Sequence, residues 1–252
     1  EPSTSNKVFF MVTKADMATT AATTAATTAT AIAATPAEKQ IPLIMSEIRT
    51  AAEKLAHIGP AVSVFGSARV SRNSPHYETT VAISAALAEA GFAVIAGGGP
   101  GIMEAANKGA FETGGTSIGL NISLPHEAHN NEYQTISLSF EYFFSRKATF
   151  FMHSFAYVAM PGGFGTLDEL FEALTLIQTG KVPPAPIVLV GSEYWSGLVE
   201  WLGGQVLANG MIGAHDLDLF IIEDDPVKVV RKVVEFHSKV NSDAEYAPSL
   251  PA

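Results

Sequence analysis

The sequence predicts an α/β fold: a Rossmann-like, doubly wound, mainly parallel sheet with helices on both faces. Short apolar runs typical of buried strands alternate with segments of helical periodicity, which is the pattern of a parallel sheet. Two glycine-rich turns, at 97–101 and 162–165, each follow such a run and precede a helix. Because ligands of these sheets bind beyond the carboxyl ends of the strands, we expect both turns to line one cleft.

The chain divides into an appendage, a helix, a main domain and a tail. Residues 1–36 predict a low-complexity appendage, because nearly every residue from 18 to 35 is Ala or Thr. Residues 37–60 predict an amphipathic helix that ends near Gly59-Pro60 and packs on the main domain or on a partner subunit. A Rossmann-like nucleotide-binding catalytic domain is expected over 61–240, and 241–252 form a tail, with fraying from Ser238 onward.

Each element of the main domain is predicted from its own pattern. Apolar runs predict strands over 61–65, 92–96, 116–120, 135–139, 155–160, 186–190 and 217–222. Helical spacing predicts helices over 75–89, 102–110, 142–152, 166–180 and 195–207. Pro226 opens a final helix, whose inward residues are expected to be Val229, Val230, Val233 and Val234.

Composition excludes several classes of function. The 252 residues, 47% of them hydrophobic, suffice for one sizeable core. The absence of cysteine excludes a disulfide framework, a thiolate metal site and a cysteine nucleophile, and it is compatible with a reducing compartment such as the cytoplasm. A formal net charge of -10 disfavours nucleic-acid binding. No apolar run approaches the ~20 residues that cross a bilayer, so we expect no membrane partner.

The turn that begins at Pro161 indicates a phosphate seat. Gly162, Gly163 and Gly165 let a ligand approach the main chain, and the amides that open the following helix favour an anion. Glu169 would then lie one turn inside the helix. The same residues also fit a capping box, in which Thr166 caps the helix and Glu169 reaches back to it.

The earlier turn, at 97–101, is a second candidate ligand contact. It lacks the spacing of the dinucleotide fingerprint and the Lys-Ser/Thr of a Walker loop. Gly98 and Gly99 are expected to border the ligand, together with Ser67 at the end of the first strand. Glu104 either contacts a ribose or simply occupies the first turn of its helix, where acids are favoured.

Taken together, the segments 97–105 and 161–169 resemble the paired motifs of the LOG ("Lonely Guy") family. The resemblance extends over about 60–237 and includes 145–147, 121–127 and 171–190. The last two of these stretches are similar to its longer, bacterial-type branch. Members are nucleoside 5′-monophosphate phosphoribohydrolases that activate cytokinins, and they were long labelled lysine decarboxylases. One departure is Ser145, where the short enzymes often carry a glutamate before the arginine.

The resemblance implies roles for particular residues. It implies that Arg146 and Glu169 are catalytic. The substrate-binding residues it implies, together with the turn chemistry, are Ser67, Gly98, Gly99, Glu104, Lys147, Pro161, Gly162, Gly163, Gly165 and Thr166. It implies no metal or organic cofactor, a homodimer or larger homo-oligomer, and a purine nucleoside 5′-monophosphate such as AMP or N6-prenylated AMP as substrate.

The expected reaction is hydrolysis of the N-glycosidic bond to a free base and ribose 5-phosphate. A nucleotide carrier or sensor of the same fold stays open as the alternative, and the missing fingerprint disfavours a dehydrogenase. Lys147 alone is poor support for a pyridoxal decarboxylase. His126, Glu127 and His129 are weak metal candidates. The aromatic residues expected to serve as core or subunit contacts rather than to stack a base are Phe143, Phe144, Phe150 and Phe151.

Overall fold

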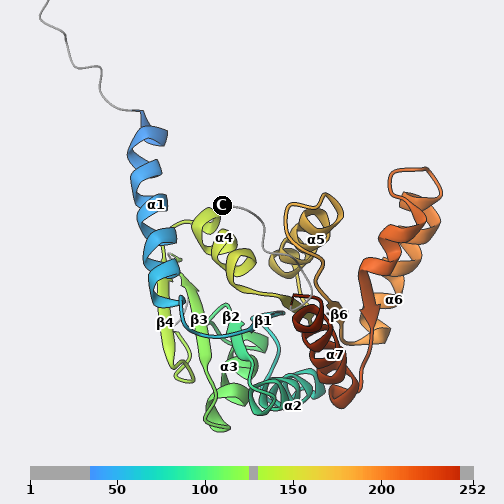
Figure 1. Ribbon diagram of the computed structural model, residues 1–252, viewed down its shortest axis with the longest axis horizontal. Helices are drawn as coiled ribbons and strands as arrows, with labels where there is room; N and C mark the ends of the chain where they lie inside the picture. Colours follow the sequence, from blue (N-terminus) through green and yellow to red (C-terminus); the bar gives the residue numbers. More distant parts are fainter. Residues whose placement is uncertain (1–34, 125–129, 245–252) are drawn as a thin grey trace, which may run out of the picture.

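The computed structural model describes residues 35–124 and 130–244, and it confirms the predicted α/β class. Seven strands form one parallel sheet in the order β4-β3-β2-β1-β5-β6-β7 (Figure 1). Their bounds are β1 Ala61–Phe65, β2 Ala93–Ala96, β3 Ser117–Ile122, β4 Ile136–Phe140, β5 Ala156–Ala159, β6 Ile187–Leu189 and β7 Phe220–Ile222. The strand predicted over 217–222 is shorter, because a 3₁₀-helix, Ala214–Leu219, precedes β7.

The strand order reverses between β1 and β5. Val62 of β1 pairs with Val94 of β2 on one side and with Ala156 of β5 on the other. The chain therefore builds outward from β1 to β4, returns, and builds in the opposite direction from β5. Connections that leave neighbouring strands toward opposite faces open a crevice at their carboxyl ends, so this point is where a ligand is expected.

Helices cover both faces of the sheet. The helices α2 (Pro75–Glu89), α3 (Ile102–Glu112) and α7 (Pro226–Ala244) lie on one face, where α2 contacts both others. The helices α1 (Pro36–Lys54), α4 (Phe143–His153) and α5 (Phe164–Gln178) lie on the other (Figure 1). Helix α6 (Ser192–Trp201) continues into a π-helix over Leu202–Leu207. Among the described residues, no helix is long and apolar enough to span a membrane.

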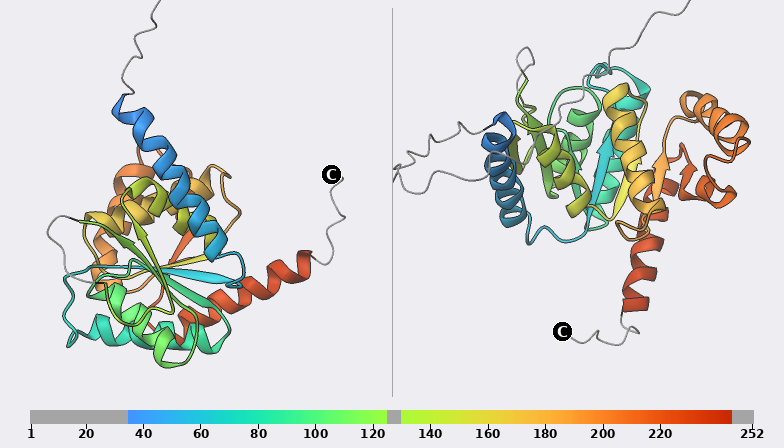
Figure 2. Two further views of the ribbon diagram at one scale, coloured as in Figure 1. Left: turned by 90° about the vertical axis from the view of Figure 1, so that its left-hand side faces the viewer. Right: turned by 90° about the horizontal axis from the view of Figure 1, so that it is seen from above.

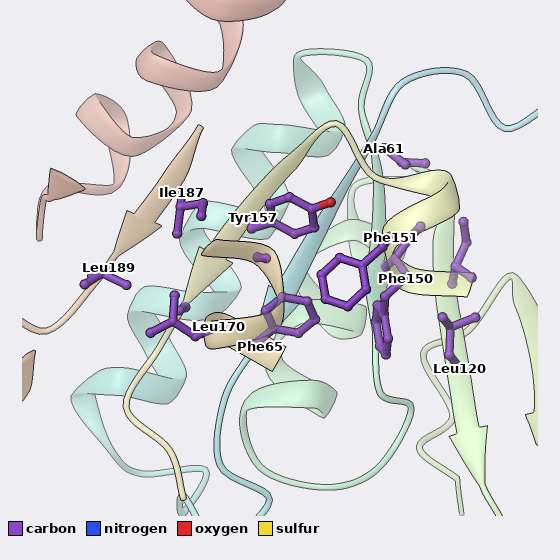
Figure 3. Packing of buried hydrophobic residues seen from close by; sticks show 14 of the residues in the cluster. Ala61, Phe65, Leu120, Phe150, Phe151, Tyr157, Leu170, Ile187 and Leu189 are labelled. Atoms are coloured by element: carbon purple, nitrogen blue, oxygen red, sulfur yellow. The ribbon is translucent and has the colours of Figure 1, made fainter. Parts of the chain in front are cut away.

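Side chains of the strands alternate between two cores, one on each side of the sheet. Val62 and Val64 point into the core beneath α2, α3 and α7. Phe65 points into the core beneath α4 and α5, where it packs edge-on against Phe150 at 5.2 Å and stacks on Tyr157 at 6.0 Å (Figure 3). This aromatic cluster fixes the helix α4 on the sheet.

Two predictions about the final helix are wrong. Val234 is 37% exposed, whereas Val229 and Val233 are fully buried as expected. The helix also continues to Ala244, so no fraying begins at Ser238. Figure 2 shows its last turns extending away from the sheet.

The N-terminal helix is found, and it packs on the main domain against α4. Ala51 and Leu55 anchor its carboxyl end in the core. Its amino-terminal half extends beyond the sheet (Figure 2), and Ile41 is exposed there. Most of the Ala/Thr appendage and the loop residues His126, Glu127 and His129 lie outside the described residues.

Candidate active site

A cleft of about 1200 Å³ opens at the carboxyl ends of β1, β2, β3 and β5. Both glycine-rich turns line it, through Gly97 and Gly99 of the first and through 162–166 of the second. Ser67 lines it as well, at the end of β1. The sequence expectation that the two turns meet in one cleft is thus met at the switch in strand order.

The amino terminus of α5 faces this cleft. Gly163 is the N-cap and makes no side-chain capping bond, and the first intrahelical bond runs from Leu167 N to Gly163 O at 3.0 Å. The amides of 164–166 precede that bond. A Cβ atom on Gly163 or Gly165 would meet no atom within 4 Å. The helix therefore offers amides and open space to an anion.

The capping-box interpretation of this turn is wrong. Helix α5 begins at Phe164, so Thr166 lies inside its first turn rather than at the cap. Thr166 is 4% exposed, and its hydroxyl oxygen lies 2.1 Å from where a Cβ on Gly162 would stand. Glycine at 162 is thus required to make room for Thr166. Tyr194 of α6 holds the same turn by donating its hydroxyl to the carbonyl of Gly162.

Arg146 lies in the first turn of α4 and is 7% exposed. Its Nε donates to the carbonyl of Leu120 at 2.6 Å, and its Nη2 donates to the carbonyl of Gly97 at 3.4 Å. The guanidinium also lies over the ring of Phe150, 5.3 Å from its centroid. A Cβ on Gly97 would stand 2.4 Å from Nη2, so the first glycine turn leaves the space that this arginine needs.

Glu169 and Arg146 face each other in the wall of the cleft. Its Oε1 lies 3.7 Å from Nη1 of Arg146, and its side chain is 13% exposed. Burial raises the pKa of Glu169 to about 7, although the charge of Arg146 opposes that rise. A carboxyl group that titrates near neutral pH beside a fixed cation, in a cleft, is typical of a catalytic site.

Comparison with known proteins identifies the family of the chain. The model of a family described as possible lysine decarboxylase matches residues 103–233, more than half of the chain. The chain belongs to this family, the LOG family. Two relatives are named cytokinin riboside 5′-monophosphate phosphoribohydrolase. LOG1 of Arabidopsis thaliana is 28% identical over 59% of this chain and 71% of its own length. The Mycobacterium tuberculosis enzyme is 28% identical over 61% and 83%.

Solved structures share the fold. The molybdenum cofactor carrier protein of Chlamydomonas reinhardtii superposes with a TM-score of 0.52 and 22% identity, over 71% of this chain and 98% of that one. At this identity the likeness shows the LOG-like Rossmann fold alone.

Four residues assigned to substrate binding by the LOG resemblance lie outside the residues that line the cleft: Gly98, Glu104, Lys147 and Pro161. Glu104 is buried in the first turn of α3, outside the residues that line the cleft. It accepts hydrogen bonds from Arg72 at 2.6 and 2.9 Å and from Tyr77 at 2.6 Å. Burial raises the pKa of Glu104, but these hydrogen bonds lower it further, so that it lies below its usual value. Lys147 pairs with Asp168 at 3.0 Å and with Glu172, and so joins α4 to α5.

Two of the predicted residues, Gly98 and Ser67, shape the glycine-rich turns. Gly98 has φ +78, which favours glycine, and its carbonyl accepts bonds from Asn131 N and Gln134 Nε2. Ser67 N donates to the carbonyl of Pro161 at 3.1 Å, so it ties the end of β1 to the second glycine turn.

Sequence reasoning missed several residues of the cleft wall. Those with side chains suited to ligand contact are Arg69, Met103, Asn121 and Tyr194. Phe143, which we expected to be a core or subunit contact, is 52% exposed and also lines the cleft. Arg69 and Asn121 could have been found, because each follows or ends a strand at its carboxyl end. Tyr194 comes from a later helix and carries no motif.

Proposed function

We propose that the chain hydrolyses the N-glycosidic bond of a purine ribonucleoside 5′-monophosphate, giving the free base and ribose 5-phosphate. The observation that carries this proposal is the buried pair Arg146 and Glu169 in a cleft that also holds the open amino terminus of α5. The names of its LOG relatives support the same reaction class.

The 5′-phosphate would bind at the amino terminus of α5. The amides of Gly165 and Thr166 and the dipole of the helix favour an anion there. Gly163 and Gly165 leave room for its oxygens. Phosphate binding at this point aligns the sugar with Glu169, which lies further along the same helix.

Glu169 would act on the ribose. As the bond between sugar and base breaks, the ribose gains oxocarbenium character, and a carboxylate beside it stabilises the charge and accepts a proton from the attacking water. The water oxygen bonds to the anomeric carbon, and the bonding electrons leave with the base, which takes up a proton. Arg146 orients Glu169 and stabilises the departing base.

AMP and N6-prenylated AMP are the substrates we expect. The cleft offers apolar side chains that suit a purine and its substituents: Met103, Ile122, Leu124 and Phe143. We expect catalysis to need no metal, and among the described residues no cluster of three or more acidic or histidine side chains could hold one. Activity in the presence of EDTA tests this point.

We further propose that the chain forms a homodimer or larger homo-oligomer. Large apolar side chains are exposed on the two helices that bear the catalytic pair: Phe144 and Met152 of α4, and Phe164 and Phe171 of α5. Exposed apolar groups of this size around a cleft are typical of subunit contacts. Light scattering on the purified chain tests the oligomeric state.

The decisive experiment is a panel of nucleoside 5′-monophosphates incubated with the chain, with chromatographic assay of the free base. Release of adenine or N6-prenyladenine supports the hydrolase. Tight binding of AMP with no release from any nucleotide would instead favour the carrier or sensor alternative.

A further inference from the structure

Helix α4 lacks its own amino-terminal cap, although it presents Arg146 to the cleft. Its N-cap, Tyr142, makes no side-chain capping bond, and its first turn contains no acidic residue. The amides at this end need acceptors, and the positive end of the helix dipole favours a nearby carboxylate. Nothing within α4 itself supplies one.

A carboxylate from a distant helix lies at this end of α4, where it binds a backbone N–H just before the helix and a side-chain hydroxyl within it. Glu47, which is half-buried on α1, accepts a hydrogen bond from the backbone N–H of Glu141 at 2.8 Å through Oε1. Its Oε2 bonds the hydroxyl of Ser145, which is fully buried. Ser145 is the residue directly before Arg146. The carboxylate thus fixes the chain on both sides of the α4 start.

Helix α1 holds Glu47 firmly enough to serve as a support. Ala51 lies one turn beyond Glu47 and is buried in the core, as is Leu55 a turn later. Helices α1 and α4 lie side by side, as Figure 1 also shows. Arg146 must keep three directed interactions at once, with Leu120, Gly97 and Glu169, so a small shift of its helical turn would disturb all of them.

We propose that Glu47 is a positioning residue of the active site, which fixes the first turn of α4 and through it the guanidinium of Arg146. This inference rests on the proposed hydrolase function. It assigns the N-terminal helix a part in catalysis, although no atom of α1 lines the cleft among the described residues.

The test compares Glu47→Ala with Glu53→Ala. Glu53 is an exposed carboxylate on the same helix, and in the described part of the chain it makes no hydrogen bond or ion pair. We expect Glu47→Ala to lower kcat for AMP about 10-fold while KM changes less than about 2-fold, because misplacement of a catalytic group costs rate rather than substrate affinity. Glu53→Ala should stay within about 2-fold of wild type in both.

A pH profile separates positioning from a general loss of stability. Glu169 is faced by Arg146 and Lys147 of α4 and by Asp168 of its own helix. If Arg146 moves away, it lowers the pKa of Glu169 less, so the limb of the kcat/KM profile that reports Glu169 should move to higher pH in Glu47→Ala. An unmoved limb with unchanged kcat would overturn the proposal.

Hydrogen exchange provides a readout that does not depend on turnover. The amides of 141–146 should exchange faster in Glu47→Ala than in Glu53→Ala, and equal exchange would overturn the proposal. If the wild-type chain releases no base from any nucleotide, the proposed function fails and this comparison alone decides on Glu47. If Glu47→Ala does not fold, Glu47→Gln takes its place, since its amide oxygen still accepts the Glu141 N–H while the charge is lost.

Discussion

Two glutamates of this chain show how surroundings decide the role of a carboxyl group. Glu104 and Glu169 each lie early in a helix that follows a glycine turn. Arg72 and Tyr77 bind Glu104 directly and keep it ionised, which suits a structural role. Glu169 is buried with its cation 3.7 Å away, and its pKa of about 7 lets it change protonation near neutral pH.

Replacement of Glu169 by Gln tests its catalytic role. We expect the variant to fold and to bind AMP, because the amide has the shape of the carboxyl group. Release of adenine should fall at least about 100-fold, since the amide neither stabilises an oxocarbenium ion nor accepts a proton. Calorimetric titration of AMP and chromatography of adenine measure the two properties. Undiminished turnover would exclude Glu169 as the catalytic carboxylate.

The protonation of Glu169 also predicts the pH dependence of turnover. Below its pKa of about 7 in the chain without ligand the group is mostly neutral, so kcat/KM for AMP should rise with pH and level off above that value. Steady-state assays from pH 5 to 9 would measure this profile. A kcat/KM that falls over the same range would show that the protonated form is active, as a donor to the departing base.

Sequence reasoning could name Glu169 but could not distinguish its setting from that of Glu104. Both follow glycine turns, and the difference arises from residues of other elements: Arg72 and Tyr77 around Glu104, and Arg146 beside Glu169. The LOG resemblance implied that Lys147 binds the substrate, and local sequence could not show that it pairs with acidic side chains instead. Its partners, Asp168 and Glu172, belong to a helix whose orientation no local pattern reveals.

At the scale of elements, the start of α5 combines helix geometry with open space. Gly165 lies in the first turn of the helix, where an alanine would be favoured by up to ~1 kcal/mol. No neighbouring atom accounts for the glycine, because a Cβ there would meet nothing within 4 Å. A glycine that folding does not require, at the mouth of a cleft, indicates space kept for a ligand.

The variant Gly165→Ala should therefore separate stability from binding. We expect thermal unfolding at or above the wild-type temperature, and a KM for AMP raised at least about 10-fold as the methyl group enters the phosphate seat. Gly197→Ala in α6 is the matched control, because it is also helical with open surroundings but lies outside the cleft. An unchanged KM in Gly165→Ala would place the phosphate elsewhere.

Element boundaries were predictable only where local chemistry sets them. Pro75 and Pro226 mark helix starts in the sequence and in the structure. The start of α5 was missed, since the Thr166–Glu169 pattern fits a cap but glycine at 163 serves instead. The 3₁₀-helix before β7 and the π-helix after α6 were also missed, because apolar spacing alone does not distinguish these helices from strands or α-helices.

For the whole molecule, the alternation of strands and helices was enough to predict a parallel sheet with two covered faces. It was not enough to predict that β1 and β5 would be neighbours, which depends on contacts between segments far apart in the chain. The position of α1 was left open for the same reason. Its contact with α4 includes the bonds of Glu47 to Glu141 and Ser145, which lie 94 and 98 residues further along the chain.

The buried pair also affects the stability of the whole fold. Glu169 has a pKa of about 7 in the folded chain and an ordinary value of 4.5 when exposed. Between these two pH values Glu169 keeps its proton in the folded chain but loses it in the unfolded chain. The stabilisation that this proton gives the fold is therefore complete below pH 4.5 and is lost as pH rises through 7. We expect the free energy of unfolding of wild type, minus that of Glu169→Gln, to fall by on the order of 3 kcal/mol across this window. Urea unfolding of both proteins at several pH values from 5 to 8 measures this difference. Subtracting the value for Glu169→Gln removes the contribution of every other titrating group, because both proteins contain those groups. A difference that stays constant with pH would mean that Glu169 is already ionised in the folded chain, and its part in the reaction would then need no proton exchange near neutrality.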